Sequence, residues 1–140
     1  MKIRMKLAHM RAASVYAELS YAKRRKVGCV IVKDDTIVIG YNGTPPGWDN
    51  NCEDPATGLS LPEVIHAEQN ALDKLVRSNV SSVGASVFVT TQPCIDCAKR
   101  LLGAQVAAVY YRDEYRNLDG VEFLRRAGIP VEKLSEAQDA

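Results

Sequence analysis

The chain has 140 residues, and its 18 Lys and Arg against 17 Asp and Glu give a formal net charge of +1. This length predicts a single domain, which we place at residues 1–134 with a frayed polar tail at 135–140. A charge near zero argues against a polyanion binder and a polybasic membrane-surface protein. Residues 1–10 lack the apolar stretch of a signal peptide and no apolar run suggests a membrane span, so we expect a cytoplasmic protein with reduced cysteines.

The first half of the chain predicts a helix, a hairpin and a long loop. Residues 3–21 place apolar side chains at helical spacing without Gly or Pro, which predicts an amphipathic helix. Residues 27–32 and 36–41 are rich in β-branched side chains and flank a short turn, which predicts an antiparallel hairpin. Residues 42–62 contain four prolines and three glycines and therefore predict an irregular loop, of a length that is usually functional.

The second half alternates helices with strands. Ser60–Glu63 fits a capping box and predicts a helix that runs to about residue 77. Later strands are expected at 83–91, 106–111 and 129–134, and later helices at 93–103 and 118–127. Strands separated by a helix favour parallel pairing. We therefore predict an α/β fold with three layers, α/β/α, whose five-stranded mixed sheet begins with an antiparallel hairpin and continues with parallel strands.

Two short motifs offer metal ligands: H-A-E at His66–Glu68 and P-C-I-D-C at Pro93–Cys97. Cys94 and Cys97 are three residues apart on a predicted helix, so both sulfurs leave the same face. They lie in its first turn, where free N–H groups and the helix dipole favour thiolates. Together with the imidazole of His66, they provide three ligands for zinc and leave the fourth tetrahedral position open for water.

Glu68 is the candidate catalytic residue. It stands two residues after His66, where its carboxylate can hydrogen-bond to a water molecule on the metal. Zinc with two thiolates is neutral in sum and acidifies water less strongly than zinc with three imidazoles. A carboxylate that takes the proton compensates for this weakness, and that is the role we assign to Glu68.

Other interpretations of these cysteines are less consistent with the sequence. A thioredoxin-like redox pair has the C-x-x-C spacing but not the accompanying H-x-E motif. A purely structural zinc needs four protein ligands, for which His9, Cys29 and Cys52 are the remaining candidates. We interpret Cys29 as a buried thiol of an apolar strand and His9 as a surface or packing residue, whereas Cys52 is open to either role.

The order H-x-E and then P-C-x-x-C on a later helix is the signature of zinc nucleobase deaminases. On these motifs the chain resembles the cytidine and deoxycytidylate deaminase superfamily, from its first helix to Ile129. Gly40–Gly47, His66–Ala71, Thr90–Cys94 and Ala127–Ile129 are similar to the deoxycytidylate (dCMP) branch. The resemblance implies a cytidine-deaminase-like fold, one catalytic Zn²⁺ per subunit, and hydrolysis of dCMP to dUMP and ammonia, which feeds dTMP synthesis.

The resemblance and the chemistry of dCMP also predict substrate contacts. Family members bind the nucleoside sugar through an Asn at the place of Asn42, although Asn-Gly is also a common turn dipeptide. Tyr115 is placed to stack on the base or to cover the pocket. The substrate phosphate needs a cation or N–H donors, which Lys26, Arg112 or Arg116 would supply. Two further residues complete the predicted substrate site: Ala67, within the first motif, and Thr91, two residues before the second.

The resemblance further implies regulation. Members of the resembling family are activated by dCTP with Mg²⁺, are inhibited by dTTP and assemble as hexamers. We place triphosphate binding on the backbone N–H groups of the 43–47 loop, with the helix after His66 as the link to zinc. The predicted allosteric residues are Gly43, Thr44, Gly47, Asn70 and Arg77. Some members hold a second zinc in the long loop, but this loop offers only Cys52 and no histidine, so none is expected.

Two alternatives remain open at this point. A tRNA adenosine deaminase shares the zinc motif but would need a basic surface for RNA, against which the net charge of +1 argues. Its loop and the residue at Asn70 would also normally differ. A non-catalytic zinc module that binds nucleotides would have no need for Glu68 beside an open metal position. Whether C5-modified forms of dCMP are accepted depends on pocket depth, which the sequence does not reveal.

Overall fold

The computed structural model describes residues 1–139 of the chain. The helices are α1 (Ile3–Ala17), α2 (Ala67–Val76), α3 (Ile95–Gly103) and α4 (Asp119–Arg126). The strands are β1 (Gly28–Lys33), β2 (Thr36–Tyr41), β3 (Ser86–Thr91), β4 (Ala108–Asp113) and β5 (Val131–Lys133). Among these residues, no helix combines the length and apolar character needed to cross a membrane.

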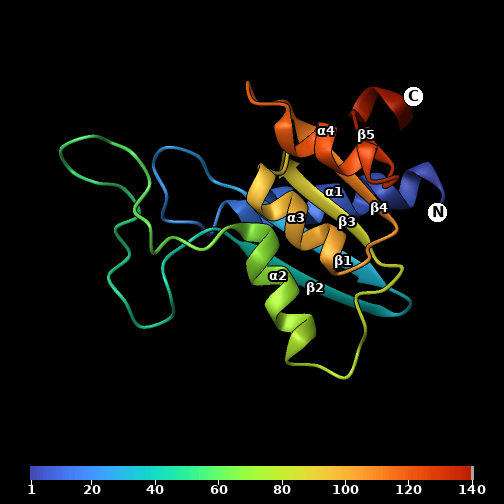
Figure 1. Cartoon of the computed structure of the whole chain (residues 1–140), viewed down its shortest axis with the longest axis horizontal. Helices are drawn as coiled ribbons and strands as arrows, with labels where there is room; N and C mark the ends of the chain where they lie inside the picture. Colours follow the sequence, from blue (N-terminus) through green and yellow to red (C-terminus); the bar gives the residue numbers. More distant parts are fainter. Residues whose placement is uncertain (140) are drawn as a thin grey trace.

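The strands form one five-stranded sheet in the order β2-β1-β3-β4-β5. β1 pairs antiparallel with β2 and with β3, whereas β3, β4 and β5 are parallel. The helix α1 lies on one face of the sheet, and α2, α3 and α4 lie on the other (Figure 1). The predicted α/β fold with a mixed sheet and an initial hairpin is therefore confirmed.

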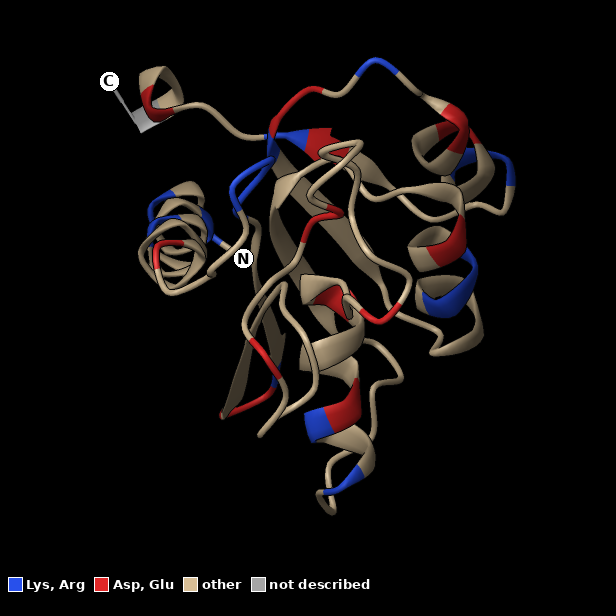
Figure 2. Ribbon diagram, turned by 90° about the vertical axis from the view of Figure 1, so that its left-hand side faces the viewer, with Lys and Arg blue, Asp and Glu red and all other residues tan. Residues whose placement is uncertain are grey.

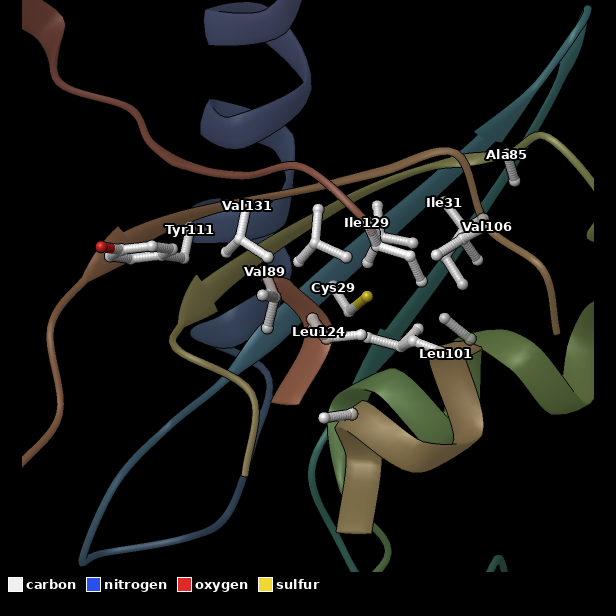
Figure 3. Close-up of a cluster of buried hydrophobic side chains, with 14 of the residues drawn as sticks. Cys29, Ile31, Ala85, Val89, Leu101, Val106, Tyr111, Leu124, Ile129 and Val131 are labelled. Atoms are coloured by element: carbon white, nitrogen blue, oxygen red, sulfur yellow. The ribbon is translucent and has the colours of Figure 1, made fainter. Parts of the chain in front are cut away.

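The two faces of the sheet are built from alternating residues of the same strands, because successive side chains of a strand point to opposite sides. Cys29 and Ile31 belong to the apolar cluster under α2, α3 and α4, while Val30 packs with α1. In Figure 3 the Cys29 thiol lies among the side chains of Leu124 and Val89. Cys29 is fully buried, as predicted.

The predicted start of α2 is wrong. Ser60 does not cap a helix but forms an isolated β-bridge with Glu53, and Ile65 forms another with Gly43. These long-range pairings occupy the backbone before the helix begins, so the irregular segment extends to His66, which is the N-cap of α2. The first helix also ends earlier than predicted, at Ala17.

The described part of the expected tail contains a short 3-10 helix, η1 (Glu136–Asp139). Arg11 of α1 forms an ion pair with Glu136 at 2.6 Å. The tail is therefore held against α1 as far as the structure describes it, and residue 140 lies outside the described residues.

Candidate metal centre and catalytic cavity

His66, Cys94 and Cys97 meet where α2 and α3 begin. Cys94 is the N-cap of α3 and Cys97 lies in its first turn. The Nδ1 atom of His66 lies 3.3 Å from Sγ of Cys97 and 3.5 Å from Sγ of Cys94, and all three donor atoms lie within 4.8 Å of one another. Donors bound to one tetrahedral zinc at about 2.1–2.3 Å are about 3.6 Å apart. The three side chains therefore fit a zinc ion.

The electrostatics of the two thiols follow from their contact. A hydrogen bond from Cys97, together with His66, lowers the pKa of Cys94 to about 3. The same bond to Cys94, followed by burial, raises the pKa of Cys97 above its ordinary value. The pKa of His66 is raised, chiefly by its hydrogen bond to Cys94. The contact therefore favours ionisation of Cys94 over that of Cys97, and metal binding would require Cys97 to release its proton.

Glu68 lies in the first turn of α2, and its side chain is only 5% exposed. Burial raises the pKa of Glu68 to about 7. A carboxyl group with a pKa near neutrality can both accept and return a proton at physiological pH. The carboxyl group of Glu68 is therefore suited to proton transfer.

A cavity of about 550 Å³ opens over His66, Glu68 and Cys94. Its volume lies in the range of sites for small organic ligands. Of the predicted substrate residues, the structure brings five into its wall: Asn42, Ala67, Thr91, Tyr115 and Arg116. The other lining residues are Arg24, Arg25, Val27, Ser60, Val64, Gln92 and Glu114.

The structure does not bring Lys26 or Arg112 into this wall. Arg112 follows Tyr111, which faces the cluster under α2, α3 and α4, so it points to the opposite face of the sheet. There its guanidinium group donates to Ser14 of α1 at 2.5 Å and pairs with Asp113 at 2.8 Å. Neither residue lies where it could bind a phosphate in this cavity.

Arg24 and Arg25, rather than Lys26, are the residues of the basic loop that line the cavity. The guanidinium carbon of Arg25 lies 5.0 Å from the centre of the Tyr115 ring, and Nη1 donates to Oγ1 of Thr91 at 3.4 Å. The main chain of Tyr115 is fixed in turn by Gln92, whose Oε1 accepts its N–H at 2.8 Å. The basic run was visible in the sequence, but which of its side chains faces the cavity was not.

Asn42 has both ends of its amide engaged. Oδ1 accepts from the N–H of Val27 at 2.9 Å, and Nδ2 donates to the carbonyl of Arg25 at 2.8 Å. The side-chain amide has two donor hydrogens and two acceptor lone pairs, so one of each is left for a ligand. Asn42 braces the cavity wall and can still contact a sugar.

The residues predicted for allosteric binding occupy two places. The backbone N–H of Gly43 was expected to be free for a ligand, but it donates to the carbonyl of Ile65. Oγ1 of Thr44 donates to the carbonyl of Asp49 at 2.7 Å, and Gly47 has a φ of +84°. Asn70 donates to the carbonyl of Tyr41 at 2.8 Å, which ties α2 to the end of β2. Arg77 is the C-cap of α2.

The remaining candidate ligands lie apart from the metal centre. His9 packs its ring against Phe88, with 5.1 Å between ring centroids, so it is a packing residue. Cys52 is buried in the long loop, and its thiol donates to the carbonyl of Asn50 at 3.6 Å.

Gly120 allows the first turn of α4 to press directly on the metal-binding segment. A Cβ atom at this position would lie 2.1 Å from the carbonyl oxygen of Pro93 and 2.8 Å from the carbonyl carbon of Cys94. We expect Gly120→Ala to lower the free energy of unfolding by about 1–3 kcal/mol, because backbone must shift, and to weaken zinc retention. Urea unfolding and zinc analysis measure both effects.

The matched control is Gly103→Ala at the end of α3, where a Cβ would meet nothing within 4 Å. This variant should be as stable as the original protein or slightly more so. Equal stability of the two alanine variants would contradict the close approach at Gly120.

Comparisons with known proteins agree with this geometry. Residues 4–113 match the family described as the cytidine and deoxycytidylate deaminase zinc-binding region. The chain belongs to this family. A probable deoxycytidylate deaminase of Caenorhabditis elegans is 36% identical over 94% of this chain and 70% of its own length. The deoxycytidylate deaminase of Saccharomyces cerevisiae is 31% identical over 93% of this chain, which spans only 45% of the yeast protein.

A solved structure covers nearly the same length. The dCMP deaminase of the cyanophage S-TIM5, in complex with dCMP and dUMP, is 45% identical and matches with a TM-score of 0.91. The match covers 96% of this chain and 99% of the phage chain. The deaminase fold expected from the motifs is thereby confirmed.

Proposed function

We propose that the protein is a zinc-dependent dCMP deaminase, which converts dCMP and water to dUMP and ammonia. The observation that carries this proposal is the cavity, whose wall contains His66 and Cys94 of the His/Cys/Cys cluster, the buried carboxyl group of Glu68 and several arginines. The relatives named deoxycytidylate deaminase and the cyanophage structure with dCMP support this choice of substrate.

His66, Cys94 and Cys97 would hold the metal, and zinc bound there would make a water molecule more acidic and place it for attack. Glu68 accepts the proton of the attacking water and passes it to N3 of the ring, while the new C–O bond forms at C4. Glu68 then carries the second proton to the amino group, which leaves as ammonia when the C4–N bond breaks. Burial keeps the pKa of this carboxyl near 7, which suits both directions of transfer.

The arginines of the cavity wall supply the cations that a nucleotide requires. Arg24, Arg25 and Arg116 line the cavity and would receive the substrate phosphate, since guanidinium groups match phosphate oxygens in charge and geometry. Asn42 would contact the sugar with its remaining donor and acceptor. Tyr115 would cover the base from its position under Arg25.

An activity panel tests this function. We expect loss of cytosine absorbance and ammonia release with dCMP, and a kcat/KM for deoxycytidine at least about tenfold lower, because hydrogen bonds between charged groups are lost. C5-methylated and hydroxymethylated dCMP report on the pocket around C5. Preference for a tRNA anticodon stem would replace the proposal with an adenosine deaminase, and no turnover of any substrate would favour a nucleotide-binding module.

In the view of Figure 2, basic and acidic segments are interspersed, which favours a small substrate over RNA.

The finer expectations from the sequence and from the family remain part of this proposal. They are a single domain at 1–134, a hexameric assembly, a cytoplasmic location, a role in dTMP synthesis, and control by dCTP with Mg²⁺ and by dTTP. The 43–47 loop would bind the regulatory nucleotide, and the bond from Asn70 to Tyr41 ties the loop-bearing end of β2 to the helix that carries Glu68.

Regulation predicts a change in the dCMP saturation curve. We expect dCTP with Mg²⁺ to shift it to lower dCMP concentration and dTTP to shift it to higher concentration, because each nucleotide would bind the active and inactive states with different affinity. Initial rates over a range of dCMP concentrations measure the shift. A curve that neither nucleotide moves would contradict the allosteric part alone.

A further inference from the structure

One buried carboxylate outside the metal centre accepts hydrogen bonds from the main chain of the loop that carries two arginines of the cavity wall. Glu53 lies in the long loop between β2 and α2 and is 9% exposed. Its two carboxylate oxygens accept the N–H of Lys23 at 3.1 and 3.2 Å, and one of them also accepts the N–H of Arg24 at 3.4 Å. Charged acceptors make the stronger hydrogen bonds of proteins. Glu53 therefore fixes the main chain from which Arg24 extends.

Glu53 is itself held in place by a small hairpin within the long loop. It forms an isolated antiparallel bridge with Ser60, and the N–H of Leu61 donates to the carbonyl of Cys52 at 2.8 Å. Cys52, its neighbour, is only 1% exposed and anchors the hairpin in the protein. The long loop thus presents a carboxylate to the basic loop from a defined position.

The basic loop is held on both sides of its two cavity arginines. Glu53 binds the main chain before and at Arg24, and Asn42 binds the carbonyl of Arg25 and the N–H of Val27. Both loops extend from the same end of the sheet (Figure 1). The positions from which the two guanidinium groups enter the cavity are therefore set before a ligand binds.

We propose that Glu53 is a positioning residue for recognition of the substrate phosphate. By fixing the main chain at Lys23 and Arg24, directly before Arg25, it sets the preference of the site for a nucleoside monophosphate over the corresponding nucleoside. This inference rests on the proposed function, in which these arginines receive the phosphate. Glu53 is not among the residues that line the cavity, so it acts through the arginines rather than by touching the substrate.

Charge and position predict opposite effects for variants of Glu53. Removal of a carboxylate beside a basic loop makes the local potential more positive, which by Coulomb attraction alone would strengthen phosphate binding. Loss of the hydrogen bonds releases the loop, so that two long side chains must be ordered when the ligand binds. A weaker affinity for phosphate in Glu53→Gln and Glu53→Ala therefore identifies positioning.

The test compares kcat and KM for dCMP and deoxycytidine in the zinc-loaded protein and its variants. We expect Glu53→Ala to raise KM for dCMP roughly tenfold, the scale of ordering two arginine side chains, with kcat and the kcat/KM for deoxycytidine within about twofold. Glu53→Gln keeps one acceptor oxygen, so its KM for dCMP should lie between those of the original protein and Glu53→Ala. The matched control is Asp54→Asn, because Asp54 accepts only within its own hairpin, from Ala56 at 2.7 Å and Thr57 at 3.2 Å.

An equal loss with dCMP and deoxycytidine in both Glu53 variants would overturn the inference, since it would indicate a merely structural role, and so would an unchanged KM. Affinity for dUMP, measured by calorimetry, gives a readout that does not need turnover. If the unmodified protein releases no ammonia from dCMP, the proposed function fails, and Glu53 is judged by dUMP: roughly tenfold weaker binding in Glu53→Ala supports positioning, and equal binding refutes it.

Discussion

Replacement of Glu68 by Gln is expected to leave zinc bound and to lower kcat for dCMP by about 10³- to 10⁴-fold, near the upper end for a single acid–base group. The amide keeps the shape of the buried side chain but cannot accept a proton from water or return one to the amine. Glu68 is buried beside His66, where few other groups can replace it. Stopped-time ammonia release and zinc analysis of the same preparation measure both parts of the expectation.

The control for this variant is Glu63→Gln, which removes an exposed carboxylate a few residues before α2 that does not line the cavity. It should keep normal kcat and normal zinc content. Activity retained in a zinc-loaded Glu68→Gln protein would refute the acid–base role, and loss of zinc in that variant would show that the side chain acts on the metal site instead.

The sequence predicted the elements whose causes are local. Cys94 and Cys97 lie at the N-cap and in the first turn of one helix, and their spacing depends on that single turn, so the metal centre could be placed from short motifs. The β-branched residues at 27–32 and 36–41 likewise predicted the hairpin that β1 and β2 form. The start of α2 was predicted wrongly because its cause lies far away in the sequence. Gly43 and Glu53 form β-bridges with the main chain of residues that a longer helix would include.

The positions of the basic side chains also depend partly on local and partly on distant contacts. Arg24 and Arg25, rather than Lys26, line the cavity. The main chain of this loop donates to Glu53 and accepts from Asn42, and no local pattern reveals these distant contacts. The position of Arg112, in contrast, could have been predicted from the sequence. It follows a residue of the buried cluster in β4, and strand alternation alone would have assigned it to the face that α1 covers.

Loss of Cys94 is the second large effect that we expect. A tetrahedral protein site for zinc contributes about 10–16 kcal/mol in all, so removing one ligand should weaken zinc affinity roughly a hundredfold to a thousandfold. Cys94 is also the thiol whose pKa is lowered by its contacts with Cys97 and His66, so Cys94→Ala removes the ligand that ionises more readily. The variant should bind substoichiometric zinc, lose deaminase activity and unfold at a lower temperature than the zinc-loaded original protein.

The matched control is Cys52→Ala, because Cys52 is a buried thiol that lies outside the His66, Cys94 and Cys97 cluster. It should retain one zinc per chain and normal activity, even if its stability falls through lost packing. This pair of variants separates the effect of a lost ligand from that of a lost buried sulfur. Full zinc content in Cys94→Ala would refute the assigned ligand set. A zinc equivalent that disappears with Cys52 would contradict the expectation of a single zinc, since it would place a second ion in the long loop.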